Sequence, residues 1–274
     1  MKEVSDSLAG RVELIELEPP AVLEIRSGHS SMSTEQVIVR GGYPELYDKP
    51  DLDSGIFYRS YIATYLERDV RQIINVSNLW DFERFLRLVA LRSGQLLNKA
   101  EPARDVGVSP STAHDWLSVL QASNQVQPLE PWFSSRTKSL VKTAKLYVSD
   151  TGVLCALLNI KTQDDLLASP YRGAIWATFV YAELRKRQIA EEGHTSLYFW
   201  RDKSNEIDFV PDKGGVVSLY EAKWSEYPDI SETKSMSVFR LKYRTGKIAA
   251  ATVVCRAQNE FRPRKILWQG RLRR

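Results

Sequence analysis

Cysteine is scarce in this sequence of 274 residues, and long hydrophobic runs are missing. Cys155 and Cys255 lie far apart, in apolar surroundings, with no CxxC motif and no Cys/His cluster. This scarcity excludes a disulfide framework and a zinc finger, and it predicts a reducing, cytoplasmic compartment. The longest apolar run, Ile248 to Cys255, is too short to span a bilayer, and the N-terminus has no hydrophobic signal core, so we expect no membrane insertion or secretion.

Several nucleotide-binding and catalytic motifs are also missing. The phosphate-binding loop GxxxxGK[ST] does not occur, because Gly246-Lys247 is followed by Ile248 and Leu241 stands where the first glycine would be. The motifs GxGxxG, HExxH and GxSxG are equally absent, and the three histidines have no metal-ligand spacing. The chain is therefore not a self-sufficient P-loop ATPase, and we expect it to bind no ATP.

The composition is that of an ordinary globular protein, and its charge is concentrated at one end. With 43% hydrophobic and 26% charged residues, the length predicts about two domains with ample core. The net charge of the chain is +4. The residues from Arg256 onward contain seven Lys/Arg and one acidic residue, Glu260, so their net charge is +6 and that of the rest of the chain is −2. A basic terminus of this kind is either a nucleic-acid contact or a solvated tail.

The first half of the chain shows helical patterns after a connector. Residues 8–42 combine a short strand-like run, the breaker Pro19-Pro20 and a Ser/Gly-rich stretch, and we interpret them as a connector. Apolar spacing predicts amphipathic helices over 56–74 and 81–92.

A winged-helix pattern comes next. A short helix from about Lys99 leads to a turn and to Ser109-Pro110, which is typical of a helix start, and strand-like residues 126–129 and 144–148 flank a basic loop, the expected wing. The exposed positions of the second helix contain no Arg or Lys. The pattern therefore fits either DNA binding or a helix-turn-helix used for packing and protein contact.

The last part of the chain predicts a compact α/β domain. A helix over 174–189 precedes strand candidates at 196–201, 206–210, 216–224 and 248–254, with a turn at 212–215. Asp208, Glu221 and Lys223 are the candidate catalytic residues of this domain. If adjacent strands place Asp208 beside Glu221, their oxygens suit Mg²⁺ or Mn²⁺, and Lys223 stabilises charge on a phosphate oxygen. The plainer interpretation is an ion pair between Glu221 and Lys223 on a solvated sheet.

The sequence resembles the C-terminal part of prokaryotic AAA-type ATPases that carry the domain of unknown function 4143. The resemblance implies a winged helix followed by a fold similar to PD-(D/E)XK nucleases, and it covers nearly the whole chain in order. The matching stretches are Ser7-Leu-Ala-Gly-Arg11 with Leu17-Glu-Pro19, Gly41-Gly-Tyr-Pro-Glu45, Tyr65-Leu-Glu-Arg-Asp69, Ser93-Gly-Gln-Leu-Leu-Asn98, Lys145-Leu-Tyr-Val-Ser-Asp-Thr-Gly152, Phe199-Trp-Arg201, Glu206-Ile-Asp208 and Glu221-Ala-Lys-Trp-Ser225.

The resemblance implies three regions: residues 1–45, the end of an ATPase domain and a connector; 46–160, a helical and winged-helix domain; and 165–274, the nuclease-like domain. The family's nucleotide-binding segments would lie before Met1. At the position of Ala177, family members usually carry a Glu, and in related nucleases that Glu is a metal ligand. Glu183 lies about 120° around the helix from Ala177, so we do not expect it to replace that Glu directly.

Two functions follow as hypotheses. The first is a nuclease-like interaction module, with weak or no catalytic activity, that binds a partner protein or the ATPase region. The second is an Mg²⁺-dependent DNA endonuclease or exonuclease of the PD-(D/E)XK class, which uses Asp208 and Glu221 as metal ligands. Both leave room for weak, nonspecific DNA contact. The candidate nucleic-acid-binding residues are Arg136, Lys138 and Lys142 in the expected wing, and Arg262, Arg264 and Lys265 in the tail.

We predict that any DNA binding is sequence-independent and steeply salt-sensitive, because basic residues lie in the expected wing and the tail and not on the candidate recognition helix. Deletion of residues 261–274 should weaken binding at low salt equally for all DNA sequences, as measured by fluorescence anisotropy. Tight, sequence-selective binding at physiological salt would contradict this prediction.

Overall fold

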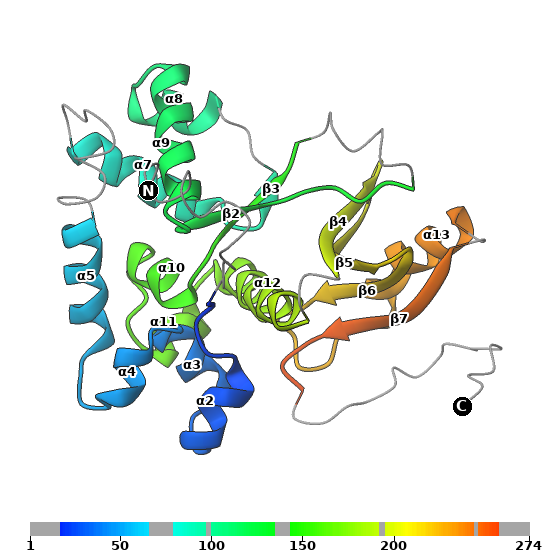
Figure 1. The fold of residues 1–274 in the computed structure, drawn as a ribbon, viewed down its shortest axis with the longest axis horizontal. Helices are drawn as coiled ribbons and strands as arrows, with labels where there is room; N and C mark the ends of the chain where they lie inside the picture. The colour runs from blue at the N-terminus through cyan, green and yellow to red at the C-terminus, as the bar shows by residue number, and fades with distance from the viewer. Residues whose placement is uncertain are drawn as a thin grey trace, which may run out of the picture.

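The protein has a mixed α/β fold in which helices come first and a four-stranded sheet follows (Figure 1). The computed structural model describes residues 17–65, 79–96, 100–134, 143–191, 195–243 and 246–257. The predicted α/β class is confirmed. Within these residues, no helix combines the length and the apolar character needed to cross a membrane.

Helices already begin in the stretch interpreted as a connector. The first four described helices are α2 (Val22–Gly28), α3 (Thr34–Arg40), α4 (Pro44–Asp48) and α5 (Ser54–Thr64). The Ser/Gly-rich stretch ends in a capping box, in which Ser33 Oγ accepts from Gln36 N and Gln36 Oε1 accepts from Ser33 N. Ile38 and Leu46 are completely buried. The connector interpretation of residues 22–42 is therefore wrong, because their serines and glycines mark helix boundaries.

Helix α5 covers the start of the helix predicted over 56–74, and residues 66–74 lie outside the described part of the chain. From residue 79 to residue 148 the described elements match the predicted helices and strands. These elements are α7 (Leu79–Leu91), β1 (Gln95–Leu96), α8 (Ala100–Val106), α9 (Pro110–Ala122), β2 (Val126–Leu129) and β3 (Lys145–Val148). Ser109 caps α9 by accepting a hydrogen bond from Thr112 N at 3.1 Å, as the Ser-Pro signal predicts. The three strands form an antiparallel sheet in the order β1-β3-β2. Residues 135–142 of the expected wing, which include its three basic candidates, lie outside the described residues.

Three helices join this region to the second sheet: α10 (Thr151–Leu157), α11 (Gln163–Ala168) and α12 (Arg172–Ala190). Asp150 fixes the first of them. Its Oδ1 accepts hydrogen bonds from the backbone N–H groups of Gly152 and Val153 and from the Tyr58 hydroxyl, while Oδ2 accepts from Gly42 N at 2.7 Å. One carboxylate therefore caps α10 and holds the loop that follows α3.

The second sheet has the strand order β4-β5-β6-β7. Its elements are β4 (Ser196–Asp202), β5 (Asn205–Lys213), β6 (Val216–Ala222), the 3₁₀ turn η3 (Ile230–Thr233), α13 (Lys234–Lys242) and β7 (Lys247–Val254). The first three strands are antiparallel, and β7 runs parallel to β6 after the α13 crossover. The predicted strands and the turn at 212–215 are confirmed, whereas α13 was not predicted.

The four-stranded sheet is packed on both faces. Val217 and Leu219 belong to a hydrophobic cluster with Phe239 of α13. Tyr220 packs against a larger cluster, to which α12 contributes Tyr181. This larger cluster extends from α3 through both sheets, so the predicted regions share one core.

The chain that leaves β2 also crosses from one sheet to the other. Phe199 of β4 donates its N–H to Glu130 O at 3.0 Å and accepts the N–H of Trp132 at 2.6 Å. The Trp132 indole then donates to Asp212 Oδ2 at 2.9 Å. The two sheets are therefore linked by backbone hydrogen bonds as well as by packing.

Replacement of Asp150 by Ala should destabilise the protein by about 3 kcal/mol, because four donors lose their acceptor within packed structure. Asp53→Ala is the matched control, since Asp53 caps α5 at an exposed site through Ile56 N, and it should cost about 1 kcal/mol. Urea denaturation measures both values. Equal losses for the two variants would show that Asp150 is only an ordinary helix cap.

Candidate functional site

Asp208 and Glu221 lie on neighbouring strands, as predicted. Asp208 is on β5 and Glu221 on β6, one position beyond the paired residues Phe209 and Tyr220. Between the pairs Tyr198–Val210 and Trp200–Ile207, β5 contains one more residue than β4, so a bulge falls at Asp208 and Phe209. Bulges redirect side chains and are frequent beside functional sites. The sheet therefore brings the two carboxylates together at an irregular point of β5.

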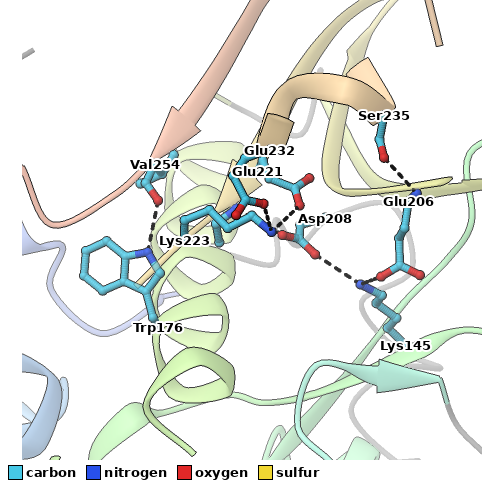
Figure 2. A network of polar contacts seen from close by, with 10 residues as sticks. Lys145, Trp176, Glu206, Asp208, Glu221, Lys223, Glu232, Ser235 and Val254 are labelled. Carbon is cyan, nitrogen blue, oxygen red and sulfur yellow. Dashed lines mark hydrogen bonds and ion pairs between the residues drawn. The ribbon is translucent and has the colours of Figure 1, made fainter. Parts of the chain in front are cut away.

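A lysine from the three-stranded sheet lies beside Asp208. Lys145, the first residue of β3, places its ammonium 2.5 Å from Glu206 Oε1 and 3.4 Å from Asp208 Oδ1 (Figure 2). Its side chain is only 4% exposed. The second oxygen of Asp208 accepts the N–H of Ala222 at 3.0 Å. Both oxygens of Asp208 are thus engaged by protein groups.

Sequence reasoning missed the role of Lys145. Glu206 and Asp208, two residues apart on β5, both reach its ammonium. One feature could have revealed this role: Lys145 is the first residue of β3, a strand whose four residues are all buried. A buried lysine needs a carboxylate partner, so its position could have pointed to an acidic strand elsewhere in the chain.

Lys223 forms a second ion-pair group next to the first. Its ammonium lies 3.1 Å from Glu221 Oε1 and 2.9 Å from Glu232 Oε2 of η3 (Figure 2). Burial lowers the pKa of Lys223, but the hydrogen bond and charge of Glu232 and those of Glu221 outweigh burial and raise it overall. The predicted Glu221–Lys223 ion pair is therefore present, and it is shared with a third residue.

Glu221 is the least satisfied group of the site. The residue is 9% exposed, and its Oε2 has no hydrogen-bond partner among the described residues. Burial, followed by the charge of Asp208, raises the pKa of Glu221 to about 7, although Lys223 opposes this shift. The Tyr147 hydroxyl is also buried and has no hydrogen-bond partner among these residues, and its pKa is raised by burial and then by Asp208 and Glu206.

These residues do not form a ready metal site. Among the described residues, no group of three or more His, Cys, Asp and Glu side chains is placed to hold a metal ion. Asp208 is engaged by Lys145 and by Ala222 N, and one oxygen of Glu221 is engaged by Lys223. Of the oxygens of Asp208 and Glu221, Glu221 Oε2 has no hydrogen-bond partner among the described residues. The geometry thus provides ammonium groups where a metal ion would need open carboxylate oxygens.

The helix that could supply a third carboxylate supplies none here. Ala177 lies on α12, which contacts β4 and β6. Glu183, on the same helix, points elsewhere: its Oε2 accepts the N–H of Val22 at 3.0 Å and its Oε1 contacts Lys186 at 2.7 Å. Glu183 therefore holds the start of α2 and does not replace the missing residue.

The nucleic-acid candidates all fall outside the described residues. They are Arg136, Lys138, Lys142, Arg262, Arg264 and Lys265. The DNA contact they suggest stays a prediction, as do the catalytic and metal-binding roles of Asp208, Glu221 and Lys223.

Comparison with known proteins agrees with part of the resemblance. Residues 172–269 match the family model described as Domain of unknown function (DUF4143), and residues 32–164 match that of Domain of unknown function (DUF8612). An uncharacterized protein of Mycobacterium bovis and one of Mycobacterium tuberculosis are each 32% identical over 240 residues. The aligned part is 87% of this chain and 53% of each relative, so the chain spans about half the length of the curated relatives it matches. No solved structure matches the chain.

The unfolding free energy should depend on pH through Glu221. Its pKa rises from 4.5 to about 7 on folding, so the native state binds this proton more tightly than the unfolded state does. That contribution is complete below pH 4.5 and is lost as pH rises through 7, by on the order of 3 kcal/mol. Urea denaturation between pH 5 and pH 8 should show this loss.

Glu221→Gln should flatten the pH dependence, because a neutral amide replaces the group that titrates. Glu45→Gln, at an exposed pair with Lys49 on α4, is the control and should leave the slope unchanged. The assignment to Glu221 is wrong if its Gln variant keeps the slope of the natural chain.

Proposed function

We propose that this chain is the C-terminal module of an AAA-type ATPase-family protein, in which a nuclease-like domain with weak or no catalytic activity serves as an interaction module. The match to the Domain of unknown function (DUF4143) supports this assignment, because the sequence resembles ATPases that carry that domain. The greater length of the matched relatives leaves room for an ATPase region. The partner would be that region or another protein, and the setting would be the cytoplasm of a prokaryotic cell.

The order of elements supports the two proposed modules. Helices α8 and α9 with the antiparallel sheet β1-β3-β2 are typical of a winged helix. Helix α12, the antiparallel strands β4 to β6, and β7 parallel to β6 after α13 resemble the core of PD-(D/E)XK nucleases. A shared fold gives no activity by itself, so the function has to be argued from the side chains.

The observation that carries the proposal is the buried ammonium of Lys145 between Glu206 and Asp208. Metal-dependent hydrolysis requires carboxylate oxygens that bind an ion and orient a water. In this chain, protein donors engage Asp208, and Ala177 stands where a third carboxylate is expected. These features favour a structural or binding role over catalysis.

The second candidate is an Mg²⁺-dependent DNA endonuclease or exonuclease. The buried Glu221 Oε2, without a hydrogen-bond partner among the described residues, favours it, because such an oxygen is costly unless it binds a proton or a cation. Asp208 lies close enough for its charge to raise the pKa of Glu221, and this closeness adds to the argument. Weak DNA contact through basic residues would accompany either function.

The chain should show little or no Mg²⁺-dependent or Mn²⁺-dependent cleavage of single-stranded or double-stranded DNA. Ala177→Glu should tighten Mn²⁺ binding, measured by calorimetry, because it restores a carboxylate on α12. Addition of Asp208→Ala to that variant should abolish the gain.

Glu183→Ala is the matched control on the same helix. It should leave Mn²⁺ binding unchanged, since Glu183 contacts Val22 and Lys186. Brisk cleavage by the natural chain that Asp208→Ala stops would refute the proposed function and establish the nuclease.

A further inference from the structure

Lys145 differs from the other cations of the site in origin and burial. It comes from β3 of the first sheet, whereas its partners Glu206 and Asp208 lie on β5 of the second, and it is 4% exposed. Lys223, by comparison, is 31% exposed and pairs with Glu221 and Glu232. A buried ammonium is stable only when carboxylates surround it closely. The position of Lys145 is therefore fixed by the contact between the two sheets.

The side chains of this centre neutralise most of its charge without a metal ion. Four carboxylates (Glu206, Asp208, Glu221 and Glu232) face Lys145, Lys223 and Arg201, the last of which lies 3.7 Å from Glu206. The formal sum of these groups is −1. Without Lys145 the sum would be −2, the charge that one divalent cation neutralises, whereas a divalent cation added beside Lys145 would bring the sum to +1.

We propose that Lys145 is the resident cation of this carboxylate centre and that it excludes divalent metal ions from Asp208 and Glu221. The inference rests on the proposed function and explains it: the chain keeps a nuclease-like arrangement of carboxylates but neutralises it with its own ammonium. Figure 2 shows Asp208 between the two ammonium groups, with Lys145 on one side and Lys223 on the other.

The proposal makes Lys145 a specificity-determining residue. Neutralising it frees Asp208 Oδ1 beside Glu221 Oε2, which has no hydrogen-bond partner among the described residues, while Lys223 stays on Glu221 Oε1. Two carboxylates with waters are a sufficient ligand set for Mg²⁺ or Mn²⁺. Metal binding at this centre should therefore appear when Lys145 loses its charge, with no other change to the chain.

The experiment measures Mn²⁺ binding to the full chain by calorimetry and by the electron paramagnetic resonance signal of free Mn²⁺. The natural chain should bind Mn²⁺ more weakly than about 1 mM. Lys145→Met and Lys145→Gln should each bind at least about tenfold tighter, because a positive charge a few ångströms away is removed. Mn²⁺ should also raise the Tm of these two variants and leave that of the natural chain unchanged.

Two further variants locate the effect. Lys242→Met removes the same charge on α13, where Lys242 forms a partly exposed pair with Asp202 of β4 at 2.6 Å, and it should not change Mn²⁺ affinity. Asp208→Asn added to Lys145→Met should abolish the gain. A gain that survives Asp208→Asn, or that Lys242→Met reproduces, would place the ion elsewhere and overturn the inference.

The remaining outcomes separate this inference from the proposed function. If neither Lys145→Met nor Lys145→Gln has a higher Mn²⁺ affinity than the natural chain, the inference is wrong while the proposed function stands. Submillimolar Mn²⁺ binding by the natural chain that depends on Asp208 also refutes the inference. Asp208-dependent DNA cleavage by the natural chain would refute the proposed function as well.

Discussion

The contact of Lys145 with Glu206 and Asp208 is the constraint on which the rest of the structure depends. An ammonium taken out of water costs several kcal/mol, and only closely placed carboxylates offset that cost. The position of β3 relative to β5 is therefore fixed, although the two strands belong to different sheets. Tyr147, two residues along β3, adds to this constraint, since it stacks on Tyr181 of α12 with ring centroids 4.3 Å apart.

The same constraint explains why the two sequence regions form one core. Ser93, after α7, accepts the N–H of Val148 at the end of β3, and its hydroxyl lies 2.8 Å from that of Thr178 on α12. Ser93 and Thr178 are buried, so separation of α12 from β3 would break the contact between their hydroxyl groups inside the core. The polar contacts and the shared hydrophobic cluster thus fix the carboxylates of the second sheet against the first.

The sequence predicted the features that depend on neighbours along the chain. Ser109-Pro110 marks the start of α9, the strand patterns place Asp208 and Glu221 on adjacent strands, and the turn at 212–215 has Gly214 and Gly215 at positive φ. It could not predict that Lys145 meets an aspartate 63 residues later. It also misread residues 22–42, because serine and glycine mark both connectors and helix ends.

The hydrogen bonds of the carboxylates, more than the topology, distinguish the two candidate functions. Both need Asp208 beside Glu221, and the sheet provides this. They differ in what satisfies the four carboxylate oxygens: the protein itself supplies Lys145, Ala222 N and Lys223 for three, and Glu221 Oε2 is left. A pKa near 7 gives that oxygen a proton in a large fraction of molecules at neutral pH. A protonated Glu221 is a poor metal ligand, so the same burial that could favour a cation also stabilises the centre without one.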